Sequence, residues 1–128
     1  MPETRAVNAA LLRRFASLAL IFVAVWGVTQ ALQRWSAHQL GSEAAAQAKP
    51  GDIQMISSVN CVYCTQARAW FTEQRIPFTE CFVERDPACA EQYRQLLAPG
   101  TPVIVVRGQP QVGFSSQRVV QALKPPQF

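Results

Sequence analysis

The stretch IQMISSVNCVYCTQARAWF, residues 53–71, decides the fold of this chain. Its first five residues, Ile53–Ser57, partly alternate apolar and polar side chains, which predicts a short strand. From Val62 to Gln74 the chain carries alanine, tryptophan and phenylalanine without any proline or glycine, which predicts a helix. Cys61 lies directly before that helix and Cys64 lies in its first turn. The stretch therefore predicts a strand-to-helix unit with two cysteines at its turn.

A second strand-to-helix unit follows. Ile76-Pro77 ends the first helix, and the alternating stretch Phe78–Val83 predicts a strand. Asp86 followed by Pro87 is a strong helix start, because the carboxylate caps the helix and proline suits its first position. Pro99-Gly100 predicts the end of that helix.

The last part of the chain predicts a hairpin and a final helix. Val103–Val106 has the composition of a buried strand, and Gly108-Gln109 is expected to form a two-residue turn with glycine first. Pro110–Gly113 would be the return strand, at a sheet edge because of its proline. Ser115 or Ser116 can cap a helix that carries the apolar residues Val119, Val120 and Leu123.

The predicted order of elements is thus β-α-β-α-β-β-α. The two early strand-to-helix units favour parallel pairing of their strands, and the hairpin adds antiparallel strands. We therefore expect an α/β fold, a four-stranded mixed sheet with helices packed on it.

The N-terminal part contains a long apolar segment. Phe15–Leu32 spans about 27 Å as a helix, close to the hydrocarbon thickness of a bilayer. Its apolar residues fall all round the helix, unlike those of a soluble amphipathic helix. The length favours an uncleaved transmembrane anchor. A cleaved signal peptide is the alternative, with small residues at Ala44–Ala46 or Ala46–Ala48 as cleavage sites.

Charge supports an orientation for this segment. Residues 1–49 hold five basic and two acidic residues, and residues 50–128 hold seven basic and six acidic ones. Arg5, Arg13 and Arg14 precede the apolar segment and only Arg34 follows it closely, so the N-terminus is expected in the cytoplasm and the domain outside it. The basic residues are few and scattered, so we expect no nucleic-acid partner.

Length and composition bound the domain organisation. The chain has 128 residues, of which 16% are charged, below the usual value of about 25%. We predict a cytoplasmic N-terminus at 1–14, a transmembrane anchor at 15–33, a linker or stalk at 34–50 and one domain at 51–128. A domain of that size excludes a barrel enzyme or a doubly wound dinucleotide fold.

The position of the first cysteine pair predicts redox chemistry. Free N–H groups at a helix N-terminus stabilise an anion, so a thiol at Cys61 should ionise easily. The thiolate is the nucleophile of disulfide exchange, and Cys64 is placed to attack the resulting mixed disulfide. Half of a zinc site is the alternative, but Cys81 and Cys89 are spaced too widely to form the usual second pair. We expect no metal.

Residues 53–123 resemble a glutaredoxin of the thioredoxin-like superfamily. The resemblance rests on Cys61-Val62-Tyr63-Cys64, on Ile76-Pro77-Phe78, on Thr101-Pro102-Val103 and on Gly113-Phe114. It implies a thioredoxin-like fold, thiol–disulfide oxidoreductase activity and a cis peptide bond before Pro102. It also implies that substrate is bound by Tyr63, Thr101, Pro102, Gly113 and Phe114.

Two differences from the usual glutaredoxin pattern bear on the reductant. Gly100-Thr101-Pro102 stands where T-V-P is usual, and Val112-Gly113-Phe114 replaces a double-glycine segment that binds glutathione. The second form is more similar to redoxins that a protein partner reduces. Glutathione as a co-substrate and a protein partner both stay open, and no resident cofactor is expected.

Cys81 and Cys89 are additional to the resembled pattern. In an oxidising compartment we expect them to form a structural disulfide. The alternative is a second redox relay, because Cys89 would lie in the first turn of a helix.

Together these features predict a membrane-anchored thiol–disulfide oxidoreductase in a bacterial inner membrane, with its domain in the periplasm. Cys61 would be the nucleophile, Cys64 the resolving thiol, and thiols or disulfides of proteins or small molecules the substrates. A non-enzymatic thioredoxin-like module, with metal-binding or static cysteines, is the alternative.

Overall fold

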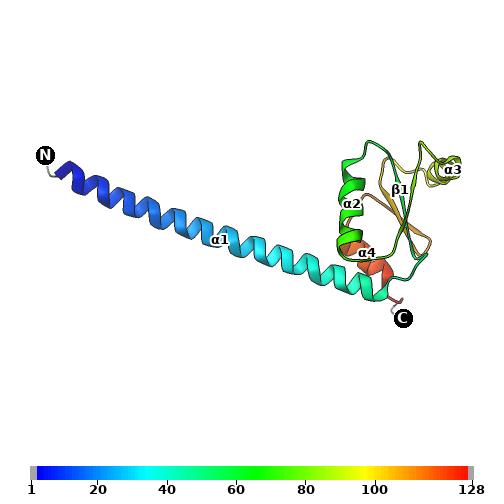
Figure 1. Cartoon of the computed structure of the whole chain (residues 1–128), viewed down its shortest axis with the longest axis horizontal. Helices are drawn as coiled ribbons and strands as arrows, with labels where there is room; N and C mark the ends of the chain where they lie inside the picture. Colours follow the sequence, from blue (N-terminus) through cyan, green and yellow to red (C-terminus); the bar gives the residue numbers. More distant parts are fainter. Residues whose placement is uncertain (1–2, 127–128) are drawn as a thin grey trace. The chain divides into compact units, whose positions relative to one another are not determined.

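A computed structural model describes residues 3–126. Its elements confirm the predicted order after an N-terminal helix (Figure 1). They are α1 (Glu3–Gln47), β1 (Ile53–Ser57), α2 (Val62–Glu73), β2 (Thr79–Phe82), α3 (Pro87–Gln95), β3 (Val103–Val106), β4 (Gln109–Val112) and α4 (Ser116–Leu123). The chain divides into two compact units, residues 1–36 and residues 37–128.

The first unit consists of the N-terminal part of α1. Its large apolar side chains from Leu11 onward are exposed, including Phe22 and Trp26. By length and composition, the helix over Leu11–Gln47 could cross a membrane, and its most apolar 18-residue window has a mean hydropathy of 1.9. This is a weak indication of a membrane span, since a signal sequence near an N-terminus has the same properties.

The second unit is built on one mixed sheet in the order β2-β1-β3-β4. β1 pairs with β2 in parallel and with β3 antiparallel, and β3 pairs antiparallel with β4. The strand that contains Pro110 thus lies at an edge, as predicted, because proline lacks the N–H that a central strand needs. The fold is thioredoxin-like.

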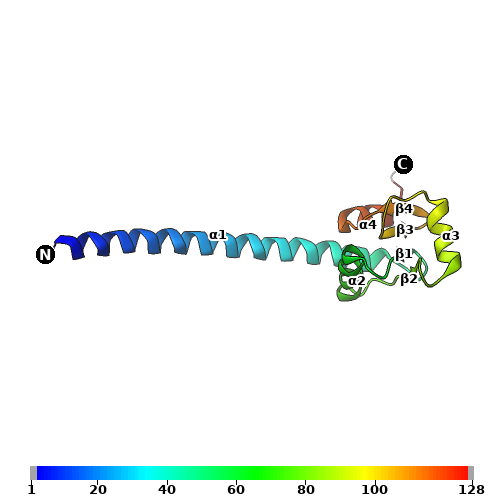
Figure 2. The ribbon, with the colours of Figure 1, turned by 90° about the horizontal axis from the view of Figure 1, so that it is seen from above.

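Alternation along the central strands sends side chains to two different layers. Ile53 and Met55 join Ile104 and Val106 in a core that α2 and α4 cover, whereas Ile56 and Val103 pack with Cys89 of α3. Figure 2 shows α2 and α4 on one face of the sheet and α3 on the other. Both faces are therefore buried, which explains the continuous apolar run of β3.

The hairpin turn corrects one expectation. Val106 pairs with Gln109, so the turn consists of Arg107 and Gly108 rather than Gly108 and Gln109. Both turn residues have positive φ, 49° and 81°, as a type I′ turn requires. Arg107 is held in this conformation by its backbone N–H, which donates to the Asp52 carbonyl at 2.7 Å.

The last turns of α1 belong to the second unit. Ala44 is completely buried in the core under α2 and α4. A Cβ on Gly41 would lie 2.0 Å from the Oε1 atom of Gln74, so glycine leaves room for that side chain against α1. Lys124 pairs with Glu43 at 3.0 Å. The compact unit thus begins upstream of residue 51, where the predicted domain begins.

Candidate active site

Cys61 is the N-cap of α2. Its backbone is extended, and its sulfur accepts a hydrogen bond from the N–H of Cys64 at 3.1 Å. Cys61 and Cys64 are joined by a disulfide, with their Cα atoms 5.2 Å apart. The N-terminal amide of a helix is thus aimed at the sulfur of Cys61, which is the arrangement that stabilises a thiolate after reduction.

The two cysteines differ in their access to solvent. Cys61 is half-buried and Cys64 is completely buried. The residues between them are open, with 72% of Val62 and 66% of Tyr63 exposed. An incoming disulfide can therefore approach Cys61 beside two exposed, uncharged side chains, whereas Cys64 is buried.

The strand register places the other predicted site residues at the same end of the sheet as Cys61. Ile56, near the end of β1, pairs with Val103, which directly follows Pro102. The Thr101–Pro102 peptide bond is cis, as the resemblance implied. The N–H of Gly113 donates to the carbonyl of Pro102 at 2.8 Å, which brings these two residues together.

Phe114 and Pro102 are less open than Tyr63. Phe114 is half-buried against the rings of Trp70 and Phe71, with centroids 5.4 Å and 5.9 Å away. Pro102 is fully buried and Thr101 half-buried. Their roles in substrate binding stay predictions.

A polar network next to α2 was not among the features predicted from the sequence. Arg68 binds Glu80 through two hydrogen bonds, and the hydroxyl of the buried residue Ser57 donates to Glu80 at 2.7 Å. Burial alone would raise the pKa of Glu80, but the hydrogen bonds from Arg68 and Ser57 and the charge of Arg68 hold it below its ordinary value. The sequence did offer one sign of this network, because Glu80 is a charged residue on a predicted strand at a position that faces the helix.

A second missed residue is Glu84, which follows β2. Its carboxylate accepts hydrogen bonds from the Ser58 hydroxyl and from the N–H of Val59, at 3.2 Å and 3.3 Å from the two oxygens. Because β1 and β2 are parallel, the segments after them emerge at one edge. A charged residue just after the second strand was therefore a usable signal.

The second cysteine pair is also bonded. Cys81 of β2 and Cys89 of α3 form a disulfide with Cα atoms 6.0 Å apart, within the ordinary range of about 4.4–6.8 Å. Cys89 is buried and Cys81 half-buried, on the sheet face that α3 covers. The bond therefore fastens α3 to the edge strand, and whether its role is structural stays a prediction.

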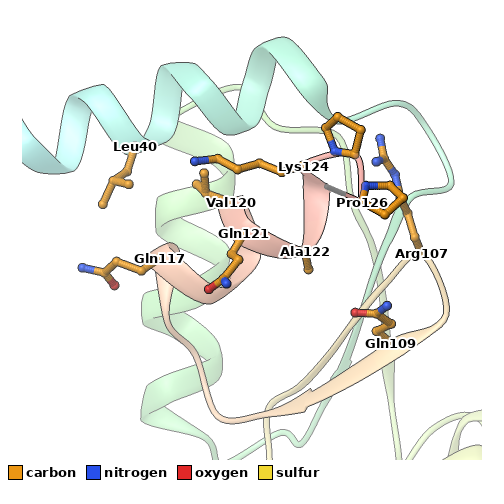
Figure 3. Close-up of a pocket in the computed structure, with 10 residues that line it drawn as sticks. Leu40, Arg107, Gln109, Gln117, Val120, Gln121, Ala122, Lys124 and Pro126 are labelled. Atoms are coloured by element: carbon orange, nitrogen blue, oxygen red, sulfur yellow. The ribbon is translucent and has the colours of Figure 1, made fainter. Parts of the chain in front are cut away.

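Figure 3 shows a pocket of about 740 Å³ that no cysteine lines. It is bordered by Leu40 of α1, by the β3–β4 turn with Arg107 and by α4 with Lys124. The turn follows Val106, at the opposite end of β3 from Pro102. The pocket therefore lies at the end of the sheet opposite to Cys61. Within residues 3–126, no cluster of three or more metal-binding side chains occurs.

Residues 53–111 match the family model for glutaredoxin. Among solved structures, the glutaredoxin-like NrdH-redoxin of Escherichia coli is 23% identical, with a TM-score of 0.50, over 59% of this chain and 97% of that one. Methanosarcina acetivorans methanoredoxin is 20% identical, with a TM-score of 0.50, over 62% and 90% of the two chains. These likenesses show a thioredoxin-like fold. A search of curated proteins finds no significant match.

Proposed function

Because residues 53–111 match the glutaredoxin family model, we propose that this chain is a thiol–disulfide oxidoreductase acting through Cys61 and Cys64. The observation that carries the proposal is the unequal burial of one bonded pair. Cys61 is accessible at a helix N-cap, and Cys64 is buried one turn later. A static structural disulfide would gain nothing from having one of its cysteines only half-buried beside open apolar residues.

The exchange proceeds in two steps. The thiolate of reduced Cys61 attacks one sulfur of a substrate disulfide, and the other substrate sulfur leaves as a thiolate that takes a proton from water. Cys64 then loses its proton and attacks the Cys61 sulfur, which forms the Cys61–Cys64 disulfide and releases the second substrate thiolate. The substrate gains two electrons, and the reverse sequence oxidises a dithiol.

Substrate is proposed to bind along the sheet edge next to Cys61. Tyr63 offers an open aromatic ring, and the Thr101–Pro102 backbone lies at the same edge with Gly113 hydrogen-bonded to it. Phe114 supports this edge from the core through its contact with Trp70. The reductant is either glutathione, as a co-substrate, or a partner protein, and no resident cofactor takes part.

The proposed location is a bacterial inner membrane. Residues 15–33 would form a single transmembrane anchor, and the redox domain would face the periplasm. The support is the exposed apolar surface of α1 and the arginines ahead of it. An oxidising compartment also suits a domain in which both cysteine pairs are bonded.

The test is turnover by the full chain in detergent. Wild type is assayed with bis(2-hydroxyethyl) disulfide plus glutathione, and separately with insulin plus dithiothreitol. We expect Cys61→Ser to abolish exchange, and reduced Cys64→Ser, mixed with insulin after dithiothreitol has been removed, to hold insulin in a persistent mixed disulfide. The double variant Cys81→Ser/Cys89→Ser is the matched control and should keep turnover. A wild-type Cys61–Cys64 bond that exchanges with neither substrate would refute the proposal and favour a static module.

A further inference from the structure

The loop that carries Cys61 is held by a carboxylate from the segment that follows β2. Glu84 accepts hydrogen bonds from the Ser58 hydroxyl and from the backbone N–H of Val59. One residue earlier, the N–H of Val83 donates to the carbonyl of Ser57 at 3.0 Å. The two residues that follow β1 are therefore held by the segment that follows β2, and Cys61 lies only two residues further on.

The contact of Glu84 with Ser58 and Val59, called the clasp below, involves a charged side chain. The hydrogen bond from Ser58 lowers the pKa of Glu84 most, and although burial opposes it, the N–H groups of Val59 and Glu84 and the charge of Arg85 lower it as well. Glu84 is thus ionised at neutral pH.

Little apolar surface depends on this contact. Glu84 is exposed, and Val59 has 45% of its surface exposed. The contact therefore adds little to the free energy of unfolding, in contrast to the network of Arg68, Glu80 and buried Ser57. What it does restrict is the path of the chain into the N-cap, where the Cys61 sulfur lies 3.1 Å from the Cys64 nitrogen.

We propose that Glu84 is a positioning residue for Cys61, holding the Ser58–Val59 segment so that the Cys61 sulfur stays on the N–H of Cys64. The inference rests on the proposed function and deepens it. Glu84 takes no proton and forms no bond with substrate; it limits the freedom of the nucleophile. Because misplacing a reacting group by about 1 Å can cost up to about 100-fold in rate, loss of the clasp should be measurable.

The test compares Glu84→Ala with Glu84→Gln in the reduced full chain in detergent. A glutamine keeps an acceptor for the Val59 N–H and a donor for the Ser58 oxygen, so it removes the charge and leaves the clasp. The alanine removes both. The control is Glu91→Ala, which removes an exposed carboxylate of α3 that pairs with Arg94.

Two quantities are measured, the rate of insulin reduction and the pH profile of Cys61 alkylation by iodoacetamide. We expect Glu84→Ala to be about tenfold slower than Glu84→Gln in exchange, a fraction of the cost of full misplacement. Its alkylation profile should shift to higher pH, while Glu84→Gln and Glu91→Ala stay near wild type. The melting temperatures should stay alike.

Equal rates and profiles for alanine and glutamine would overturn the proposal. So would a loss in Glu84→Ala that follows a lower melting temperature, since the residue would then be merely structural. If wild type catalyses no exchange but the alkylation profile still shifts in Glu84→Ala alone, the proposed function fails and the positioning role stands.

Discussion

Arg68 of α2 and Glu80 of β2 are joined by a two-pronged ion pair, with Nε–Oε2 and Nη2–Oε1 distances of 2.7 Å and 2.6 Å. Only 14% of the Glu80 side chain and 38% of the Arg68 side chain are exposed. The pair therefore ties α2, the helix that begins at the bonded pair Cys61–Cys64, to the parallel strand next to β1. It combines geometry and partial burial, the two conditions under which an ion pair contributes to stability.

This pair predicts a pH dependence of stability. The pKa of Glu80 is lowered from 4.5, so its stabilisation is complete above that value and is lost as pH falls through the folded-state pKa. We expect Glu80→Gln to cost about 1–2 kcal/mol at pH 7, or roughly 5–15 °C in melting temperature. The difference between wild type and variant should shrink below pH 4.5.

The measurement is thermal unfolding by circular dichroism from about pH 3 to 8. These values lie on both sides of the ordinary pKa of a side-chain carboxyl group, which is about 4. Glu91→Gln is the matched control, because Glu91 also pairs with an arginine but is exposed. Its cost should stay within about 0.5 kcal/mol. A Glu80→Gln variant as stable as this control would contradict the prediction.

Cys61 should be the thiol that reacts first in the reduced protein. Its sulfur is at the helix N-cap and half-buried, whereas Cys64 is fully buried. Limited alkylation near neutral pH, followed by peptide mapping, should label Cys61 ahead of Cys64. Preferential labelling of Cys64 would reverse the assignment of nucleophile and resolving thiol.

Cys81 and Cys89 are predicted to stabilise the domain without taking part in exchange. Their bond closes a loop of about nine residues, for which chain entropy predicts somewhat under 3 kcal/mol. Cys81→Ser/Cys89→Ser should therefore lower the melting temperature by roughly 10 °C or more. Exchange at Cys61–Cys64 should persist; unchanged stability with lost turnover would instead indicate a redox relay.

The last turns of α1 should be needed for full stability of the redox domain. A fragment starting at residue 51 lacks buried Ala44, the Glu43–Lys124 ion pair and the Gln47 carbonyl that Arg107 binds at 3.2 Å. We expect it to melt at least about 5 °C below a fragment starting at residue 37, the shift for about 1 kcal/mol. Equal melting temperatures of the two fragments would show that this segment is dispensable.

The proposed topology predicts the outcome of proteolysis. Protease added to bacterial spheroplasts should remove the domain and leave a small embedded fragment containing residues 15–33, because the arginine bias keeps the N-terminus inside. A cytoplasmic marker protein should stay intact as the control. Full protection of the domain, or a soluble mature form starting near Ala48, would be incompatible with an outward-facing anchor.

Local patterns in the sequence were sufficient for the order and type of the elements. The alternation in β1, the Asp86-Pro87 helix start and the apolar run of β3 each depend on neighbouring residues only, and all three were predicted correctly. The cysteine pair at a strand-to-helix turn was visible for the same reason. The cis bond before Pro102 came from the resemblance and is present in the structure.

Tertiary structure alone decided the contacts between segments that are far apart in sequence. Strand register and helix packing, which no local pattern specifies, decide three of these contacts. They are the Arg68–Glu80 ion pair, the Glu84–Val59 hydrogen bond and the burial of Ala44 in the core. The hairpin turn was misplaced by one residue for the same reason. Turn propensity favours glycine first, but the conformation of Arg107 is stabilised by Asp52, which lies more than fifty residues away.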